Sequence, residues 1–133
     1  MTASRKIEDL HPALQPLCQE FLARAEAQDI DVLITCTWRS NAAQDLLYAQ
    51  GRSLVGRVVT NARGGQSAHN FMIKGKPASK AFDVVPMLGG KCMWSSSYPA
   101  WQVLGQIGMD LGLNWYGAAG SKFHELPHFQ LKE

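Results

Sequence analysis

The sequence predicts an α+β fold in which a small, mostly antiparallel sheet is flanked by helices. Two stretches, residues 10–28 and 99–111, carry apolar side chains at helical spacing. Short β-branched or apolar stretches lie between and after them, separated by turns that contain glycine or proline. These helical and extended stretches are few and mixed in order, which favours α+β. A chain of 133 residues has the usual size of one domain, so we expect a single domain over residues 1–133.

The first third of the chain is expected to form a helix, a strand and a second helix. Residues 10–28 predict an amphipathic helix. Residues 32–38 are β-branched and largely apolar, and they predict a strand. Ser40 or Asn41 then supplies a side chain that can cap a helix over residues 42–49.

The middle of the chain predicts a long loop and a hairpin. Residues 50–65 are rich in glycine, serine, asparagine and arginine, which is typical of a loop, with a short strand at residues 58–60. One extended piece ends near residues 72–73 and another runs over residues 81–85. The polar turn between them, residues 74–77, predicts that the two pieces form a hairpin.

The last part of the chain predicts a loop, a helix and two short strands. Residues 88–97 are rich in glycine and serine, and Ser97 is a candidate cap for the helix over residues 99–111. Residues 113–116 and 126–131 predict the two strands.

The composition is that of a globular protein with a small positive charge. Hydrophobic residues make up 46% and charged residues 18% of the chain, the net charge is +2, and the pI is about 8.5. This charge is too small to predict a nucleic-acid partner, although it suits an acidic polymer such as a cell wall. No apolar run resembles a signal peptide or a membrane segment. We therefore expect a protein that is made in a cytoplasm without a signal peptide.

The cysteines do not predict a disulfide framework or a cysteine-rich metal site. Cys18, Cys36 and Cys92 are odd in number and widely spaced, and no CxxC pair is present. We expect three reduced thiols.

Two imidazoles, one carboxylate and one further acid form the candidate functional constellation. A hairpin between His69 and Asp83 would bring these two side chains together, and His128 adds a second imidazole near the C-terminus. Three nitrogen and oxygen ligands with an open position are typical of a catalytic zinc site. Glu125 lies three residues before His128 and would be a base for a water molecule at the metal. His124 is a weaker candidate, because Pro127 makes a continuous helix through both histidines unfavourable.

The motifs around these residues resemble the D-alanyl-D-alanine metallopeptidase and hedgehog superfamily. Residues 67–71, Ser-Ala-His-Asn-Phe, and residues 81–85, Ala-Phe-Asp-Val-Val, resemble its Ser-x-His and Ala-x-Asp signature. Residues 125–130, Glu-Leu-Pro-His-Phe-Gln, resemble its terminal acid-x-x-His motif. Residues 37–53 contain Arg-Ser-x(3)-Gln and Leu-Tyr-x-Gln-Gly-Arg, which are most similar to the L-alanyl-D-glutamate endopeptidases of phage endolysins and their bacterial relatives. The resemblance covers residues 10–131 and implies a hedgehog/DD-peptidase-like fold.

The chain departs from the family pattern in three places. His69 and Asp83 are 14 positions apart, whereas the family usually has seven, so we expect a longer hairpin tip between them. The family often has Gly-Gly-Asp-Trp after the tryptophan equivalent to Trp115, and here residues 116–120 are Tyr-Gly-Ala-Ala-Gly. Glu125 stands where many relatives have aspartate.

The resemblance implies a role for each candidate residue. His69, Asp83 and His128 would bind Zn²⁺, with Glu125 as the general base. Arg39 and Gln44 would stabilise the oxyanion or hold a substrate carboxylate, although local sequence alone favours surface positions for both. The remaining candidates are Ser67, which would orient a ligand or a substrate group, and Trp115, which would be either a cleft wall or a core residue.

The function implied by this resemblance is hydrolysis of peptidoglycan stem peptides between L-alanine and D-glutamate. The enzyme would be a monomeric phage endolysin that is stored in the host cytoplasm and acts on the cell wall after release. A D,D- or L,D-carboxypeptidase would use the same zinc site, and a non-catalytic hedgehog-like zinc-binding module is a further alternative. Glu125 argues against the module, because a structural site needs no positioned base.

Overall fold

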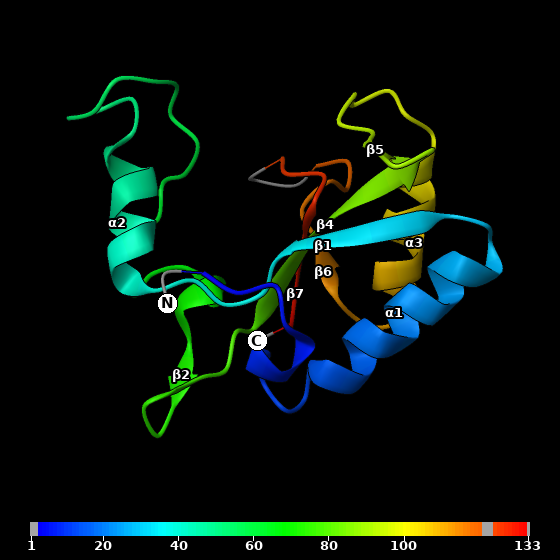
Figure 1. Cartoon of the computed structure of the whole chain (residues 1–133), viewed down its shortest axis with the longest axis horizontal. Coiled ribbons are helices and arrows are strands. Elements are labelled where there is room, and N and C mark those ends of the chain that lie inside the picture. Colours follow the sequence, from blue (N-terminus) through cyan, green and yellow to red (C-terminus); the bar gives the residue numbers. More distant parts are fainter. Residues whose placement is uncertain (1–2, 121–123, 133) are drawn as a thin grey trace.

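An antiparallel sheet with two helices on one face organises the molecule (Figure 1). The computed structural model describes residues 3–120 and 124–132, and within them the sheet has five strands. Its order is β1 (Asp31–Cys36), β4 (Ala81–Leu88), β7 (His128–Gln130) and β6 (Asn114–Trp115), with β5 (Lys91–Cys92) paired to the end of β4. Helices α1 (Gln15–Ala27) and α3 (Ala100–Asp110) pack against each other and against this sheet. The predicted α+β fold is confirmed.

One face of the sheet contributes to a buried aromatic core beneath the two helices. Phe82 on β4 and Phe129 on β7 are adjacent in register, and Phe21 of α1 packs edge-on against both, with ring centroids 5.3 and 4.9 Å away. All three rings are fully buried. Because side chains alternate along a strand, the residues next to these phenylalanines, Asp83 and His128, face the opposite side of the sheet.

Two glycines let α3 lie directly on the sheet. A Cβ atom at Gly105 would collide with the indole ring of Trp115, and one at Gly108 would collide with the ring of Phe129. Both glycines are buried inside a helix, where glycine is otherwise unfavourable. The close approach explains why they are present.

Helix α2 (Asn41–Ala49) and the loop after it form a lobe that stands apart from α1 and α3 (Figure 1). Ser40 caps this helix as predicted, since its Oγ accepts a hydrogen bond from the Ala43 amide at 3.0 Å. Arg52 fastens the loop to the helix by donating hydrogen bonds to the carbonyls of Tyr48 and Thr60 at 2.6 and 3.1 Å. The short strand predicted at residues 58–60 is absent from this described loop.

The predicted hairpin between residues 72–73 and 81–85 is wrong in its pairing. Strand β2 (Met72–Ile73) pairs instead with β3 (Lys76–Pro77), and β4 pairs with β1, β5 and β7. The turn between β2 and β3 has two residues with positive φ, as two-residue hairpin turns require. The extra residues before Asp83 therefore form a small hairpin of their own, which projects from the molecule (Figure 1).

Several element boundaries differ from those that the sequence predicts. Helix α1 begins at Gln15 rather than at residue 10, because the chain first makes a short 3-10 helix, η1 (Ile7–Asp9), and a turn. The N-cap of α3 is Pro99, not the predicted Ser97, and it makes no side-chain capping bond. Strand β4 continues past the predicted residue 85 to Leu88, where the unpredicted β5 pairs with it.

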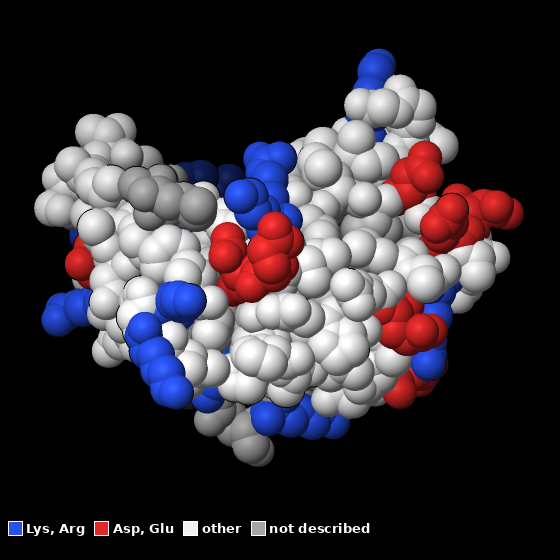
Figure 2. All heavy atoms as spheres, turned by 60° about the horizontal axis from the view of Figure 1, so that its bottom comes forward, with Lys and Arg blue, Asp and Glu red and all other residues white. Residues whose placement is uncertain are grey.

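The surface carries charges of both signs. Figure 2 shows basic and acidic side chains interspersed over one face, with much uncharged surface between them, in keeping with the net charge of +2. Among the described helices, none has the length and apolar character needed to cross a bilayer.

We expect Gly108→Ala to lower the free energy of unfolding by about 1–3 kcal/mol, since overpacking against Phe129 outweighs the gain in helix propensity. Urea denaturation measures this change. Gln106→Ala, at an exposed position of the same helix, is the matched control and should change stability by less than about 0.5 kcal/mol. A Gly108→Ala protein as stable as the wild type would contradict direct packing of α3 on Phe129.

Candidate metal centre and cleft

The register of the sheet builds one row of polar side chains on the face opposite the helices. Asp83 in β4 is the direct cross-strand partner of Cys36 in β1 and of His128 in β7. Tyr116, just after β6, extends this row, because its amide donates to the His128 carbonyl at 3.1 Å. The row therefore runs Cys36, Asp83, His128, Tyr116 across four neighbouring chain segments.

A β-bulge turns Cys36 into this row. The pairing of β1 with β4 shifts between Ile34 and Cys36, so that Ile34 opposes Val84 and Cys36 opposes Asp83. Ile34 packs against the core, and regular alternation would have placed Cys36 on that same side. The Cys36 thiol instead lies 3.8 Å from His69 Nδ1.

A tightly bonded 3-10 helix, η2 (Ala68–Asn70), positions His69 over the row. Ser67 caps it, with Oγ accepting from the His69 amide at 3.2 Å. Asn70 accepts from the amides of Gly65 and Ser67 and donates to the Arg39 carbonyl at 2.9 Å. The Arg39 amide in turn donates to the His69 carbonyl at 2.9 Å, which fixes η2 to the end of β1.

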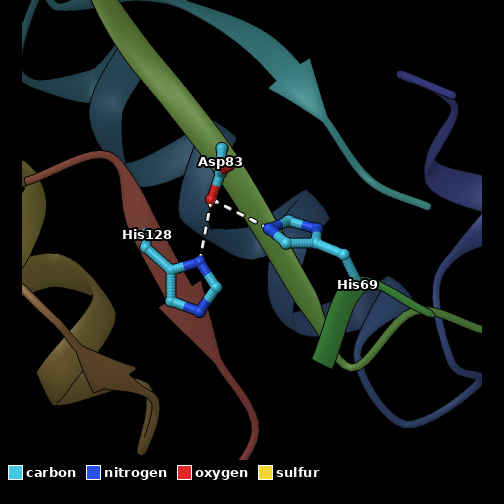
Figure 3. A group of neighbouring side chains, drawn as sticks. All are labelled: His69, Asp83 and His128. Atoms are coloured by element: carbon cyan, nitrogen blue, oxygen red, sulfur yellow. Dashed lines mark hydrogen bonds and ion pairs between the residues drawn. The ribbon is translucent and has the colours of Figure 1, made fainter. Parts of the chain in front are cut away.

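His69, Asp83 and His128 converge on one point although they come from three segments (Figure 3). Asp83 Oδ1 lies 3.2 Å from His69 Nε2 and 3.0 Å from His128 Nδ1. One potential ligand atom from each residue lies within 4.8 Å of the other two. Both imidazoles are buried, while the Asp83 side chain keeps 21% of its surface exposed. The sequence prediction that these three residues meet agrees with this geometry.

The outer nitrogen of each imidazole faces an oxygen acceptor. His69 Nδ1 lies 2.8 Å from the Thr37 carbonyl, and His128 Nε2 lies 2.8 Å from Gln130 Oε1. A nitrogen that donates there carries a hydrogen, so a neutral imidazole keeps its lone pair on the inner nitrogen. In that protonation state two lone pairs and a carboxylate oxygen point at one another, so the state requires a cation between them. Without a metal ion, the inner nitrogens instead carry hydrogens that are donated to Asp83 Oδ1. Outer partners of this kind are typical of metal-binding histidines, so the residues fit a metal ion.

The charges of the three groups are strongly coupled. Burial alone would lower the pKa of His69, but the charge of Asp83 and its hydrogen bond outweigh burial and raise that pKa to about 10. Burial would raise the pKa of Asp83, but the charge of His69 and the hydrogen bonds of both imidazoles hold it far below its ordinary value. Without a metal ion, His69 therefore holds a proton in the place where a cation would bind.

Arg39 flanks the centre beside Cys36 and Asp83. Its guanidinium donates to Gln44 Oε1 at 2.8 Å and to Cys36 Sγ at 3.5 Å, and lies 4.0 Å from Asp83 Oδ2. Gln44 is buried and donates to the Ala62 carbonyl at 2.9 Å, so it holds both Arg39 and the loop after α2. The solvated helix face that local sequence favours for Gln44 is therefore wrong, whereas Arg39 makes an ion pair as local sequence suggests, but from a partly buried position beside the centre.

Glu125 is exposed beside the centre. Its amide donates to the Tyr116 carbonyl at 3.0 Å, and its carbonyl accepts from the His128 amide at 3.3 Å. The Tyr116 ring leans against His128, with centroids 4.4 Å apart. Burial, and then the charge of Glu125, raise the pKa of Tyr116. Glu125 and His128 are therefore fixed to the same segment of backbone.

Two adjoining hollows of about 780 and 590 Å³ lie at the centre: His69, Asp83 and His128 all line the second, and of these three only His128 lines the first. Both hollows are lined by Thr60, Ser67, Glu125 and His128, so they meet at the candidate metal centre. The first also contains Tyr116 and Gln130, and the second contains Arg39 and the exposed indole of Trp94. Together they provide a cleft that holds the centre and continues beyond it past His128.

Trp115 is the one candidate that lies away from this cleft. It is 5% exposed, packs in the hydrophobic core, and donates from Nε1 to the Leu126 carbonyl at 2.8 Å. Its neighbour Tyr116 lines the cleft instead, because alternation sends adjacent side chains to opposite faces.

Sequence reasoning missed the outer partners of the histidines and Tyr116. Gln130 was detectable in principle, since it lies two residues after His128 on a predicted strand and so shares its face. The Thr37 contact is made by a backbone carbonyl and leaves no sequence signal.

The comparisons with known proteins point to one family. No protein-family model matches the chain. The chain is 34% identical over 130 residues to the peptidoglycan L-alanyl-D-glutamate endopeptidase CwlK of Bacillus subtilis, a match that covers 92% of this chain and 74% of CwlK. The crystal structure of the Serratia marcescens L-Ala D-Glu endopeptidase ChiX has a similar fold, with a TM-score of 0.61 and 22% identity over 95% of this chain and 83% of ChiX.

We expect Gln130→Ala to weaken metal binding, measured with added Zn²⁺ as the probe, by about 10- to 100-fold, because His128 loses the acceptor that orients its ring. Competition with a chromophoric chelator measures the affinity. His69→Ala should abolish binding, and Gln102→Ala, at an exposed position of α3, should leave it unchanged. Wild-type affinity in Gln130→Ala would contradict the orienting role of Gln130.

We expect metal binding to release a proton at neutral pH. The pKa of His69 in the metal-free protein is about 10, above its ordinary 6.5, so His69 is protonated at pH 7 and must lose that proton to become a ligand. Affinity should therefore rise as the pH rises toward 10. Calorimetric titrations in buffers of different ionisation enthalpy detect the released proton, and a binding heat independent of the buffer would contradict this account.

Proposed function

The chain belongs to the peptidoglycan L-alanyl-D-glutamate endopeptidases, and we propose that it is a zinc peptidase that cleaves the stem peptides of peptidoglycan between L-alanine and D-glutamate. The observation that carries the metal part of this proposal is the pair of inner imidazole nitrogens that meet the Asp83 carboxylate. The substrate is proposed from CwlK, whose name gives that bond.

His69, Asp83 and His128 would hold the zinc ion. Two imidazoles and one carboxylate match the nitrogen and oxygen ligands that catalytic zinc sites use, and such sites leave a position open. Zinc held there would supply Lewis-acid chemistry: it would polarise the peptide carbonyl and make a water molecule more acidic. The buried sheet face and the bonds from Thr37 and Gln130 keep the ligands in place before the metal arrives.

Glu125 would act as the general base. Its carboxylate accepts a proton from the attacking water and delivers it to the amine of D-glutamate as the peptide bond breaks. Its exposed position in the cleft, beside His128 and on both hollows, supports this role. A structural metal site would need no such carboxylate, which disfavours the non-catalytic module.

The reaction would also be supported by three further residues near the centre, which are Arg39, Gln44 and Ser67. The Arg39 guanidinium lies close to Asp83 and faces the second hollow, where it can bind a substrate carbonyl or carboxylate. Gln44 aims that guanidinium by accepting one of its hydrogen bonds. Ser67 uses its hydroxyl to fix the His69 backbone, so we assign it to ligand orientation.

The shape of the cleft favours an endopeptidase over a carboxypeptidase. A carboxypeptidase needs a pocket that ends near the scissile bond and holds a terminal carboxylate. Here the hollow that holds the centre adjoins the first hollow at Ser67, Glu125 and His128, so the cleft continues beyond the centre and leaves room for further residues of a peptide. Action as a phage endolysin, and as a monomer, stay predictions from the sequence.

Digestion of purified peptidoglycan followed by mass spectrometry tests the bond that is cut. Cleavage before D-glutamate creates a new amino terminus on that residue, whereas a D,D- or L,D-carboxypeptidase releases free D-alanine. Release of D-alanine without a new amino terminus would overturn the endopeptidase assignment.

We expect Glu125→Gln to reduce peptidoglycan hydrolysis by about 10²–10⁴-fold, because glutamine keeps the shape but accepts no proton. Zinc content and thermal midpoint should stay at wild-type values, since Glu125 is exposed and is not a ligand. Glu125→Asp should retain part of the activity. Glu26→Gln, at an exposed position of α1, is the matched control. Full activity in Glu125→Gln would exclude Glu125 as the base.

A further inference from the structure

Tyr116 is tied by its backbone to both the metal centre and the proposed base. Its amide donates to the His128 carbonyl at 3.1 Å, and its carbonyl accepts from the Glu125 amide at 3.0 Å. These bonds place Tyr116 at the end of the row that contains Asp83 and His128. The backbone of Tyr116 is therefore held directly to the backbones of His128 and Glu125.

The side chain of Tyr116 belongs to the cleft and not to the core. Its ring packs at 51° on the ring of His128, with centroids 4.4 Å apart, and is half-buried. It lines the first hollow together with Glu125 and His128. Among the residues that the structure describes, no side chain or carbonyl forms a hydrogen bond with its hydroxyl. The phenol is therefore rigidly supported and has an O–H group available to a bound molecule.

A second hydrogen-bond donor beside the centre, Arg39, is on the opposite flank. Its guanidinium is engaged by Gln44 and Cys36 and lies near Asp83. Arg39 thus lies at the Cys36 end of the row and Tyr116 at its His128 end, so the two donors flank the centre. The scissile carbonyl needs donors where negative charge develops as water adds to it.

We propose that Tyr116 is a catalytic residue whose hydroxyl donates a hydrogen bond to the oxygen of the scissile carbonyl, and more strongly to the oxyanion that forms from it. This inference rests on the proposed peptidase function. The phenol keeps its proton throughout: water forms the new C–O bond, Glu125 carries the water's proton to the departing nitrogen, and the C–N bond breaks. Tyr116 acts only by stabilising charge.

Tyr116→Phe tests this role, because it removes the hydroxyl and keeps the ring on His128. On a soluble stem-peptide fragment we expect kcat to fall by about 10²-fold, with KM within twofold of the wild type. The affinity for a phosphinate analogue of the tetrahedral oxyanion, measured by calorimetry, should fall by the same factor. Zinc content and thermal midpoint should not change. Tyr98→Phe, a tyrosine outside both hollows, is the matched control.

The outcomes separate this inference from the function on which it rests. An active wild type with an unchanged kcat in Tyr116→Phe overturns the role of Tyr116 alone. A rise in KM with unchanged kcat and unchanged phosphinate affinity also overturns it, since the hydroxyl would then contact only the ground state. Failure of the wild type to release the D-glutamate amino terminus overturns the peptidase function, and the inference with it.

Discussion

The pairing register between β4 and its two neighbours is the constraint on which the structure depends. Asp83 must face Cys36 on one side and His128 on the other, while Phe82 faces Phe129 on the helix side. A slip of one residue would exchange the two faces, sending an imidazole into the aromatic core and a phenylalanine into the cleft. The hydrophobic core therefore also specifies the candidate metal centre, because the same pairing that buries Phe82 and Phe129 brings Asp83 and His128 together.

The proposed function and the stability of the fold place opposite demands on the polar row that contains Asp83 and His128. Two imidazoles and a carboxylate on a largely buried surface are unfavourable unless a cation lies between them. The outer bonds to Thr37 and Gln130 hold the rings so that they cannot turn away to find other partners. The fold thus keeps a site that its packing alone would disfavour, and a bound cation, either a proton or a metal ion, relieves the conflict.

The sequence was sufficient for the parts of the site that side chains encode locally. The grouping of His69, Asp83 and His128, and the capped helix after Ser40, could be predicted because the motifs and the capping residue each leave a pattern. The pairing of β2 with β3 could not be predicted in this way. A two-residue turn at Lys74 and Gly75 competes with longer-range pairing of β2 to β4, and the local pairing forms instead. The sequence also could not decide between Trp115 and Tyr116. It shows two adjacent aromatic residues, and only the strand register determines which ring faces the cleft.

The β2–β3 hairpin between His69 and Asp83 has a base that is fixed independently of its tip. The Ala78 amide closes onto the Phe71 carbonyl, and Ser79 is bonded on both sides to the N-terminal segment at Asp9 and His11. Beyond that base, β2, β3 and their turn are largely exposed. The number of residues between His69 and Asp83 therefore does not determine the distance between their side chains. We therefore expect this tip to accept an affinity tag or a wall-targeting peptide, close to the candidate cleft, without a change in the positions of His69 and Asp83.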